Sequence, residues 1–173
     1  MTKKERALLA VQTLEEVYPQ ATCALQYEKP YELLIAVRLS AQCTDARVNQ
    51  ITPKLFAAYP TLESLAAADI ADLEDIVRPC GFFHMKAKSI KEMSAQLILN
   101  FGGVVPDNME DLLSLSGVGR KTANLILGDV YGKPAIVADT HFIRITGRLG
   151  LTKSKDPVPV SYTHLTLPTN SRV

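Results

Sequence analysis

Apolar residues recur every three or four positions along most of the chain, which is the spacing of one face of an α-helix. In the first segment, Thr2 and Glu5 have the spacing of a capping box. An apolar series follows and continues until Pro19: Ala7, Leu8, Val11, Leu14 and Tyr18. The pattern predicts an amphipathic helix at the start of the chain.

Two further helices are predicted in the first third of the sequence. Pro30 is a favourable first helical residue, and it precedes an apolar run that we interpret as a buried helix: Tyr31, Leu33, Leu34, Val37 and Leu39. Residues 45–59 have the next helical pattern, which Pro53 is expected to kink or divide.

Three more helices follow at short intervals. Pro60 and Thr61 open a short one, Asp69 caps another, and residues 86–101 predict a longer helix that ends at Gly102. No two neighbouring segments alternate between apolar and polar residues with period two, which a sheet would require. The sequence therefore predicts an all-α fold with short connections.

A pair of helices around a glycine-rich turn is predicted at residues 107–131. Asp107 and Glu110 have capping-box spacing, and the leucines that follow stop at Ser116-Gly117-Val118-Gly119. A second apolar helical face begins at once: Ala123, Ile126, Leu127 and Val130. This arrangement is a helix-hairpin-helix.

The hairpin glycines point to contact with a DNA backbone. We expect one of Gly117 and Gly119 to adopt positive φ, and both to let a phosphodiester approach without a Cβ in the way. Amides at the start of the second helix then face the phosphates, independently of base sequence. The alternative is an ordinary turn, but Arg120 and Lys121 directly after the glycines favour DNA binding.

Two residues near the hairpin could carry chemistry. Lys121 would ordinarily be a solvated surface lysine, but at the first turn of a helix beside Arg120 it meets a positive potential that favours the neutral, nucleophilic amine. Asp139 follows the apolar residues 136–138 and precedes a helix predicted at residues 142–149. Its alternative interpretation is a plain N-cap.

Composition narrows where and how the protein acts. The net charge of +1 excludes a broadly basic surface, so DNA contacts must be local. The cysteines at 23, 43 and 80 are too widely spaced for a disulfide framework or a metal knuckle, which fits a reducing compartment. With no apolar stretch of membrane-spanning length, we expect a cytoplasmic protein that associates with the nucleoid when bound to DNA.

Four sequence motifs follow one another along the chain. They are Leu-Ser-Ala-Gln-Cys-Thr-Asp at 39–45, Gly-Phe-Phe at 81–83 with Lys-Ala-Lys at 86–88, Leu-Ser-Gly-Val-Gly-Arg-Lys-Thr-Ala at 115–123 and Val-Ala-Asp-Thr-His at 137–141. Together, from about residue 3 to residue 157, they resemble the endonuclease III family of helix-hairpin-helix DNA glycosylases. The resemblance implies a bifunctional enzyme that flips an oxidised pyrimidine out of duplex DNA, removes it and nicks the abasic site.

The resemblance also implies a role for each matching residue. Lys121 is the nucleophile that attacks the sugar C1′ and forms a Schiff base for β-elimination, and Asp139 activates the amine and stabilises positive charge on the sugar. Gln42 fills the gap left by the flipped base, and Phe82 is the apolar wedge on the opposite strand. His141 either shapes the base pocket or is a buried structural residue.

The other residues of the hairpin, one cysteine and two histidines are also assigned. The backbone of the hairpin contacts DNA through Gly117, Val118, Gly119 and Arg120. Cys43 is interpreted as a packing residue, and His84 and His164 are given no functional role. The expected partner is double-stranded DNA containing oxidised pyrimidines or abasic sites, bound by a monomer without any membrane.

The resemblance divides the chain into a helical barrel domain and a second lobe. Residues 21–133 form the barrel, residues 1–20 and 134–157 form an incomplete second helical lobe, and residues 158–173 are interpreted as a disordered or foreign tail outside the family pattern. Family members usually ligate a [4Fe–4S] cluster through four closely spaced cysteines, which are absent after Cys80, so this chain is expected to hold no metal or cofactor. We interpret it as C-terminally truncated and expect it to be unstable or poorly active, with the cluster restored in a full-length form.

Two other functions remain open at this point. A monofunctional base-mismatch glycosylase would have the same fold but would not need a lysine at position 121. A non-catalytic helix-hairpin-helix module would use Lys121 only as a phosphate contact.

Overall fold

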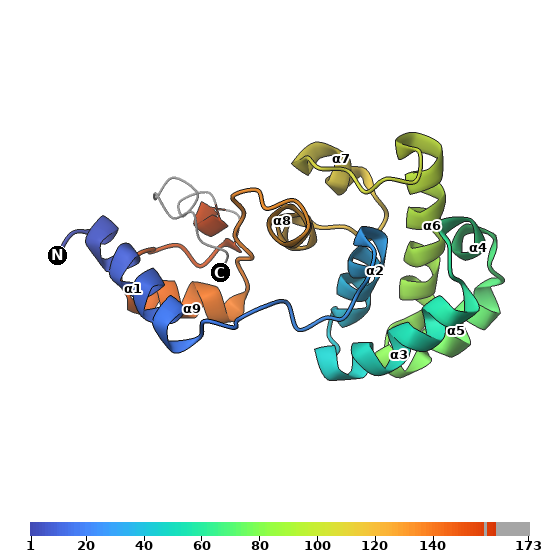
Figure 1. Cartoon of the computed structure of the whole chain (residues 1–173), viewed down its shortest axis with the longest axis horizontal. Helices are drawn as coiled ribbons and strands as arrows, with labels where there is room; N and C mark the ends of the chain where they lie inside the picture. Colours follow the sequence, from blue (N-terminus) through green and yellow to red (C-terminus); the bar gives the residue numbers. More distant parts are fainter. Residues whose placement is uncertain (158, 162–173) are drawn as a thin grey trace. The chain divides into compact units, whose positions relative to one another are not determined.

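The computed structural model describes residues 1–157 and 159–161, and within these residues it is all-α, as predicted (Figure 1). No helix in this described part is long and apolar enough to cross a membrane. The helices are α1 (Lys3–Val17), α2 (Pro30–Ser40), α3 (Asp45–Ala58), α4 (Leu62–Ala67), α5 (Ile70–Val77), α6 (Phe83–Phe101), α7 (Met109–Ser114), α8 (Arg120–Asp129) and α9 (Thr140–Arg148), with a 3₁₀ turn, η1, at Arg78–Cys80.

The chain forms two compact units. One comprises Cys23–Ile126, which contains α2 to α7 and the start of α8. The other comprises Met1–Thr22 and Leu127–Val173, and its described part contains α1, the end of α8 and α9. The domain boundaries drawn from the sequence stay a prediction.

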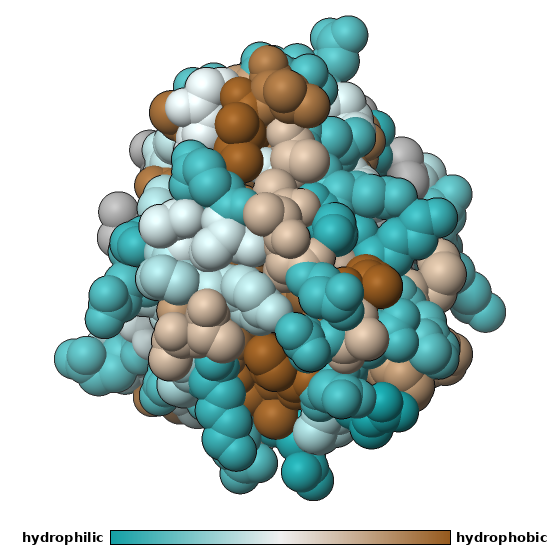
Figure 2. All heavy atoms as spheres, turned by 90° about the vertical axis from the view of Figure 1, so that its right-hand side faces the viewer, coloured by the Kyte–Doolittle hydropathy of each residue, from teal (hydrophilic) through white to brown (hydrophobic). Residues whose placement is uncertain are grey.

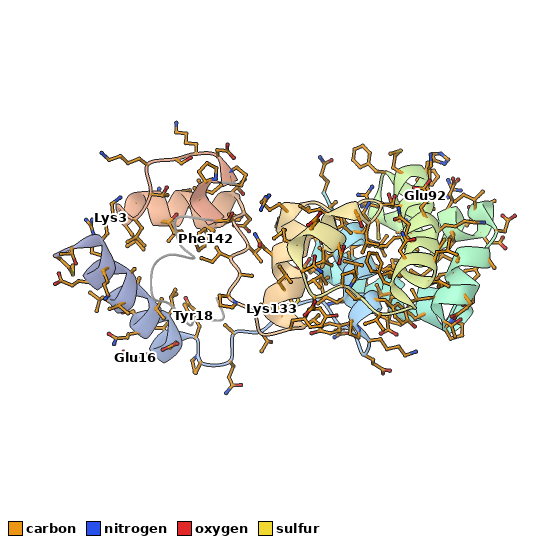
Figure 3. The ribbon with its side chains drawn as sticks, turned by 90° about the horizontal axis from the view of Figure 1, so that it is seen from above. Lys3, Glu16, Tyr18, Glu92, Lys133 and Phe142 are labelled. Carbon is orange, nitrogen blue, oxygen red and sulfur yellow. The ribbon has the colours of Figure 1, made fainter. Side chains whose placement is uncertain are left out.

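The core of the Cys23–Ile126 unit forms around α2 and α6. The predicted buried helix is confirmed, since α2 is almost wholly enclosed by its neighbours, and α6 packs against α4, α5 and α2. Figure 3 shows the side chains of this unit crowded between its helices. On the face turned to the viewer in Figure 2, apolar residues form narrow patches among hydrophilic ones. The fully buried apolar side chains include Leu33, Leu34, Leu39, Leu55, Leu65, Leu73, Ile90, Met93, Leu97 and Leu112.

Three details of the predicted helices are corrected by the structure. Pro53 does not divide α3, because it lies on the exposed side while the buried face of the helix is held in the core. Helix α6 begins at Phe83, before the predicted start at residue 86. Helix α7 is capped by Asn108, whose side chain accepts from the Asp111 amide at 3.0 Å, so the predicted pair of Asp107 and Glu110 is wrong by one position.

The second unit begins with the predicted capping box. The Thr2 amide donates to Glu5 at 2.8 Å, and the Glu5 amide donates to Thr2 Oγ1 at 3.2 Å. Arg6 Nη2 donates to the carbonyl of Gly150 at 3.3 Å and so ties α1 to the segment after α9. Of the predicted apolar face, Ala7 is buried whereas Leu8 and Leu14 are exposed.

The segment assigned to the tail is described only in part. Residues 159–161 are helical, and Val160 and Ser161 are buried. The rest of the predicted tail, with His164, lies outside the described residues.

Candidate functional site

The glycine hairpin joins α7 to α8 in a tight turn. Gly117 has a φ of +76°, as expected for one of the two glycines, and the amide of Val118 donates to the carbonyl of Leu115 at 3.1 Å. The Val118 side chain is buried, and the amide of Ala123 donates to the carbonyl of Gly119 at 2.9 Å, which begins the helical bonding of α8. The buried valine anchors the turn while the glycines on either side stay exposed.

Gly117 and Gly119 differ in what surrounds the position where a side chain would lie. A Cβ on Gly119 would meet nothing within 4 Å, which leaves room for another molecule to approach, as expected. A Cβ on Gly117 would lie 2.6 Å from Nε of Arg38 and 3.0 Å from Cβ of Ser89. The side-chain position of Gly117 therefore faces the protein, whereas its backbone is exposed, and the expected approach of a phosphodiester to that backbone stays a prediction.

Helix α6 holds the residue that enters the hairpin. The Ser116 amide donates to Oε1 of Gln96 at 2.7 Å, and its hydroxyl donates to Oε2 of Glu92 at 2.8 Å. Glu92 lies on α6, where Figure 3 labels it. Two side-chain bonds to a packed helix fix the entry of the hairpin more firmly than the exposed turn could by itself.

Lys121 is exposed in the first turn of α8, directly after the hairpin. Arg120 begins the helix beside it. The start of an α-helix presents backbone amides at the positive end of the helix dipole. An exposed amine is thus placed next to a surface suited to phosphate.

Asp139 lies in the other unit as the N-cap of α9. Its Oδ1 accepts from the amide of Phe142 at 2.7 Å, so the N-cap interpretation is confirmed. The helix begins at Thr140, two residues before the predicted start. The cap uses one carboxylate oxygen, and the second oxygen remains for other contacts.

A basic depression follows α9 in the same unit, and the sequence reasoning did not identify it. It has a volume of about 630 Å³, and Thr140, directly after Asp139, lines it. Its cations come from the helix and from the segment that follows: Arg144, Arg148, Lys153 and Lys155. Spacing along α9 shows two of these side chains on one face, but only folding brings the two lysines beside them.

Gln42 and Phe82 share an uncommon backbone conformation. They are the non-glycine residues with positive φ in the described part of the chain, at +55° and +48°. Both are exposed, and Phe82 leaves 68% of its surface accessible although it is large and apolar. Strained backbone of this kind costs about 1–3 kcal/mol per residue and clusters at functional sites.

Lys86 connects the segments that carry these two residues, although helices α3, α4 and α5 and the turn η1 lie between it and Gln42 in the sequence. Its ammonium is buried and donates to the carbonyl of Leu39 at 2.8 Å and to that of Cys80 at 2.7 Å. Burial lowers the pKa of Lys86, an effect opposed by electrostatic interaction with Cys80 and Cys43. Sequence reasoning gave Lys86 no separate role, because a lysine in a helical pattern is normally exposed.

Two cysteines and two histidines lie in distinct environments in the structure. Burial, aided by interaction with Cys43, raises the pKa of the Cys80 thiol to about 11. His141 is exposed, so its alternative as a buried structural residue is wrong. His84 Nδ1 lies 2.7 Å from a carboxylate oxygen of Glu74, a local pair that needs no catalytic role.

The chain does not provide the ligands of a [4Fe–4S] cluster. Such a cluster is held by four cysteine thiolates, and the sequence contains three cysteines. Within residues 1–157 and 159–161, no group of three or more potential ligands could hold a metal ion. The residues present therefore do not fit the cluster.

The all-helical fold and the exposed lysine after a glycine hairpin define a class of protein, the helix-hairpin-helix DNA-binding proteins. Residues 35–166 match the family described as HhH-GPD superfamily base excision DNA repair protein, and the match extends beyond residue 157, where the resemblance was expected to end. Endonuclease III of Synechocystis sp. is 46% identical over 160 residues, which cover 92% of this chain and 73% of the relative. The chain belongs to the endonuclease III family of base-excision repair DNA glycosylases.

A further curated relative and two solved structures are also endonuclease III proteins. Endonuclease III of Haemophilus influenzae is 41% identical over 157 residues, covering 91% of this chain and 74% of the relative. Two solved structures, a non-covalent endonuclease III–DNA complex and a trapped endonuclease III–DNA covalent intermediate, each match with a TM-score of 0.91 and 38% identity. Each match covers 98% of this chain and 80% of the solved one.

Proposed function

We propose that this chain removes oxidised pyrimidines from duplex DNA and then cleaves the abasic site through a Schiff base on Lys121. The observation that carries the proposal is the exposed amine of Lys121 in the first turn of α8, directly after the hairpin. A similar protein has been trapped as a covalent intermediate with DNA, which supports covalent chemistry here.

The proposed reaction passes through a covalent imine between Lys121 and the sugar. The neutral amine of Lys121 attacks C1′ of the sugar, the bond from C1′ to the base breaks, and the base leaves with a proton. Ring opening gives a protonated imine between Lys121 and C1′. Loss of a proton from C2′ then expels the 3′ phosphate by β-elimination, and water hydrolyses the imine and returns the lysine.

Asp139 is proposed to accept the proton from Lys121 and to stabilise positive charge on the sugar. Its N-cap bond to the Phe142 amide fixes the orientation of the carboxylate without using both oxygens. A carboxylate that is already oriented loses less freedom when it meets the charged sugar, which increases its effect on the rate.

The remaining residues are proposed to bind and open the DNA. The backbone of Gly117, Val118, Gly119 and Arg120 contacts phosphates, Gln42 fills the vacated stack, Phe82 wedges into the opposite strand, and His141 shapes the base pocket. Exposure of Gln42, Phe82 and His141 agrees with these roles. Filling the stack offsets an unstacking cost of a few kcal/mol.

The function is tested with a duplex that contains one oxidised pyrimidine. Release of the base together with strand cleavage is the expected result. Base release without cleavage would instead indicate a monofunctional glycosylase. Binding without either reaction would indicate a DNA-binding module.

The two hairpin glycines should respond differently to alanine. Gly117→Ala places a methyl against Arg38 at positive φ and should lower the free energy of unfolding by about 1–3 kcal/mol. Gly119→Ala meets open space and should lower it by less than about 1 kcal/mol, while weakening binding to duplex DNA. Urea unfolding and a DNA-binding titration check both, and equal stability losses would contradict this account.

A further inference from the structure

The two exposed residues in left-handed conformation are joined through one buried side chain. Lys86, on α6, has 1% of its surface accessible. Its ammonium donates to the carbonyls of Leu39 and Cys80, which are distant in sequence from each other. A single cation therefore connects the end of α2 to the end of η1.

Each carbonyl lies just before a residue proposed to enter DNA. Leu39 belongs to the last turn of α2, three positions before Gln42, and Cys80 ends η1, two positions before Phe82. The segment after α2 is also held by the amide of Cys43, which donates to the carbonyl of Ser40 at 3.0 Å. The amide of Gly81 donates to the carbonyl of Arg78 at 3.1 Å.

The electrostatics suit a cation at this place. Carbonyls in the last turn of a helix have no partner within it and form the negative end of its dipole, which a cation stabilises. The thiols of Cys43 and Cys80 lie close to the ammonium, and burial keeps the Cys80 thiol neutral at physiological pH by raising its pKa to about 11. The two acceptors of the Lys86 ammonium are backbone carbonyls.

Strained backbone persists only where surrounding contacts hold it. Neither Gln42 nor Phe82 is held by burial of its own side chain, since both are exposed. Their conformations must therefore be held by the adjoining backbone. The carbonyl of Phe82 accepts from the backbone amide of Lys86 at 3.1 Å, and the Lys86 ammonium holds the segments that precede both residues.

We propose that Lys86 is a positioning residue for DNA opening, which holds the Gln42 and Phe82 segments in one fixed arrangement so that both residues enter the duplex together. The proposal rests on the proposed function, because it assumes that these two residues separate the strands. It places no role on Lys86 in the chemistry of Lys121. Loss of the Lys86 ammonium should therefore slow the reaction on fully paired duplex DNA and leave the reaction on unpaired DNA almost unchanged.

The test compares Lys86→Met with Lys91→Met. Lys91 is on the same helix and donates to one carbonyl, that of Ala68, far in sequence from both DNA-opening residues, so its variant controls for loss of a lysine–carbonyl bond. Borohydride trapping is measured on an abasic site in a full duplex and on the same site inside a short unpaired bubble. A second readout is the fluorescence of 2-aminopurine opposite the abasic site, which rises when that base unstacks.

For Lys86→Met we expect the trapping rate on duplex to fall about tenfold or more, and the rate in the bubble to stay within about twofold, because opening costs least where bases are already unpaired. The 2-aminopurine signal should fall in parallel, whereas Lys91→Met should keep the parent ratio of duplex to bubble. Lys86→Arg, which can still donate to both carbonyls, should restore part of the duplex rate.

The proposal would be overturned if Lys86→Met kept the parent ratio of trapping rates on duplex and bubble DNA, whether both rates fell equally or neither changed. If the parent chain traps no adduct on either DNA, the proposed function fails, and the fluorescence readout still decides the role of Lys86. An unchanged 2-aminopurine signal in folded Lys86→Met would then overturn it.

Discussion

Replacing Lys121 with alanine is expected to abolish covalent trapping on abasic-site DNA and to lower strand cleavage by about 10³-fold or more, because the amine that forms the Schiff base is gone. The side chain is exposed, so folding should be unaffected and the melting temperature should stay close to that of the parent. Borohydride reduction followed by denaturing gel electrophoresis measures the adduct directly.

A matched control is available on another exposed helical surface. Lys54→Ala, on α3, removes a lysine of the same kind away from the hairpin and should leave trapping unchanged. Binding of Lys121→Ala to duplex DNA should persist within about tenfold, since one phosphate contact contributes little by itself. An adduct that survives in Lys121→Ala would show that another amine is the nucleophile.

The second large effect is expected at Asp139. Asp139→Asn keeps an oxygen that can accept from the Phe142 amide, and asparagine caps helices about as well as aspartate, so stability should change by less than about 0.5 kcal/mol. The amide cannot accept a proton from Lys121 or neutralise charge on the sugar. Base excision should therefore fall about 10²–10⁴-fold, the range typical of general acid–base catalysis.

Asp69 provides the matched control for this variant. It caps α5, where its Oδ1 accepts from the amides of Ala71 and Asp72. Asp69→Asn makes the same chemical change in an N-cap and should leave excision unchanged. Similar activity losses in the two variants would mean that Asp139 acts as a structural cap alone.

Local pattern was sufficient where neighbouring residues decide the structure. Apolar spacing predicted the helices, Thr2 with Glu5 predicted the first cap, and Asp69 predicted another. One error occurred where two local signals were equivalent. Asn108 with Asp111 has the same spacing as Asp107 with Glu110, and in the structure Asn108 is the cap.

The same distinction holds for the site: features formed by residues adjacent in the sequence were predicted, and features formed by separate segments were not. The hairpin and the exposure of Lys121 follow from sequence-adjacent residues, since small residues permit the turn and the helix begins at once. The basic depression along α9 depends on side chains from two segments and could not be read from spacing.

Local sequence pattern was enough to show that this protein is helical, where its glycine hairpin lies and which lysine follows it, because each of these depends on contacts between residues close in the chain. Long-range packing was needed to show that Gly117 faces Arg38, that Gln42 and Phe82 take left-handed backbone, and that Lys86 is buried between the segments carrying them. These features require atoms from distant parts of the chain to meet. From the sequence pattern, Lys86 is expected to be exposed to solvent. It can be buried because the ends of α2 and η1 meet at its ammonium and supply carbonyls that replace water as hydrogen-bond acceptors.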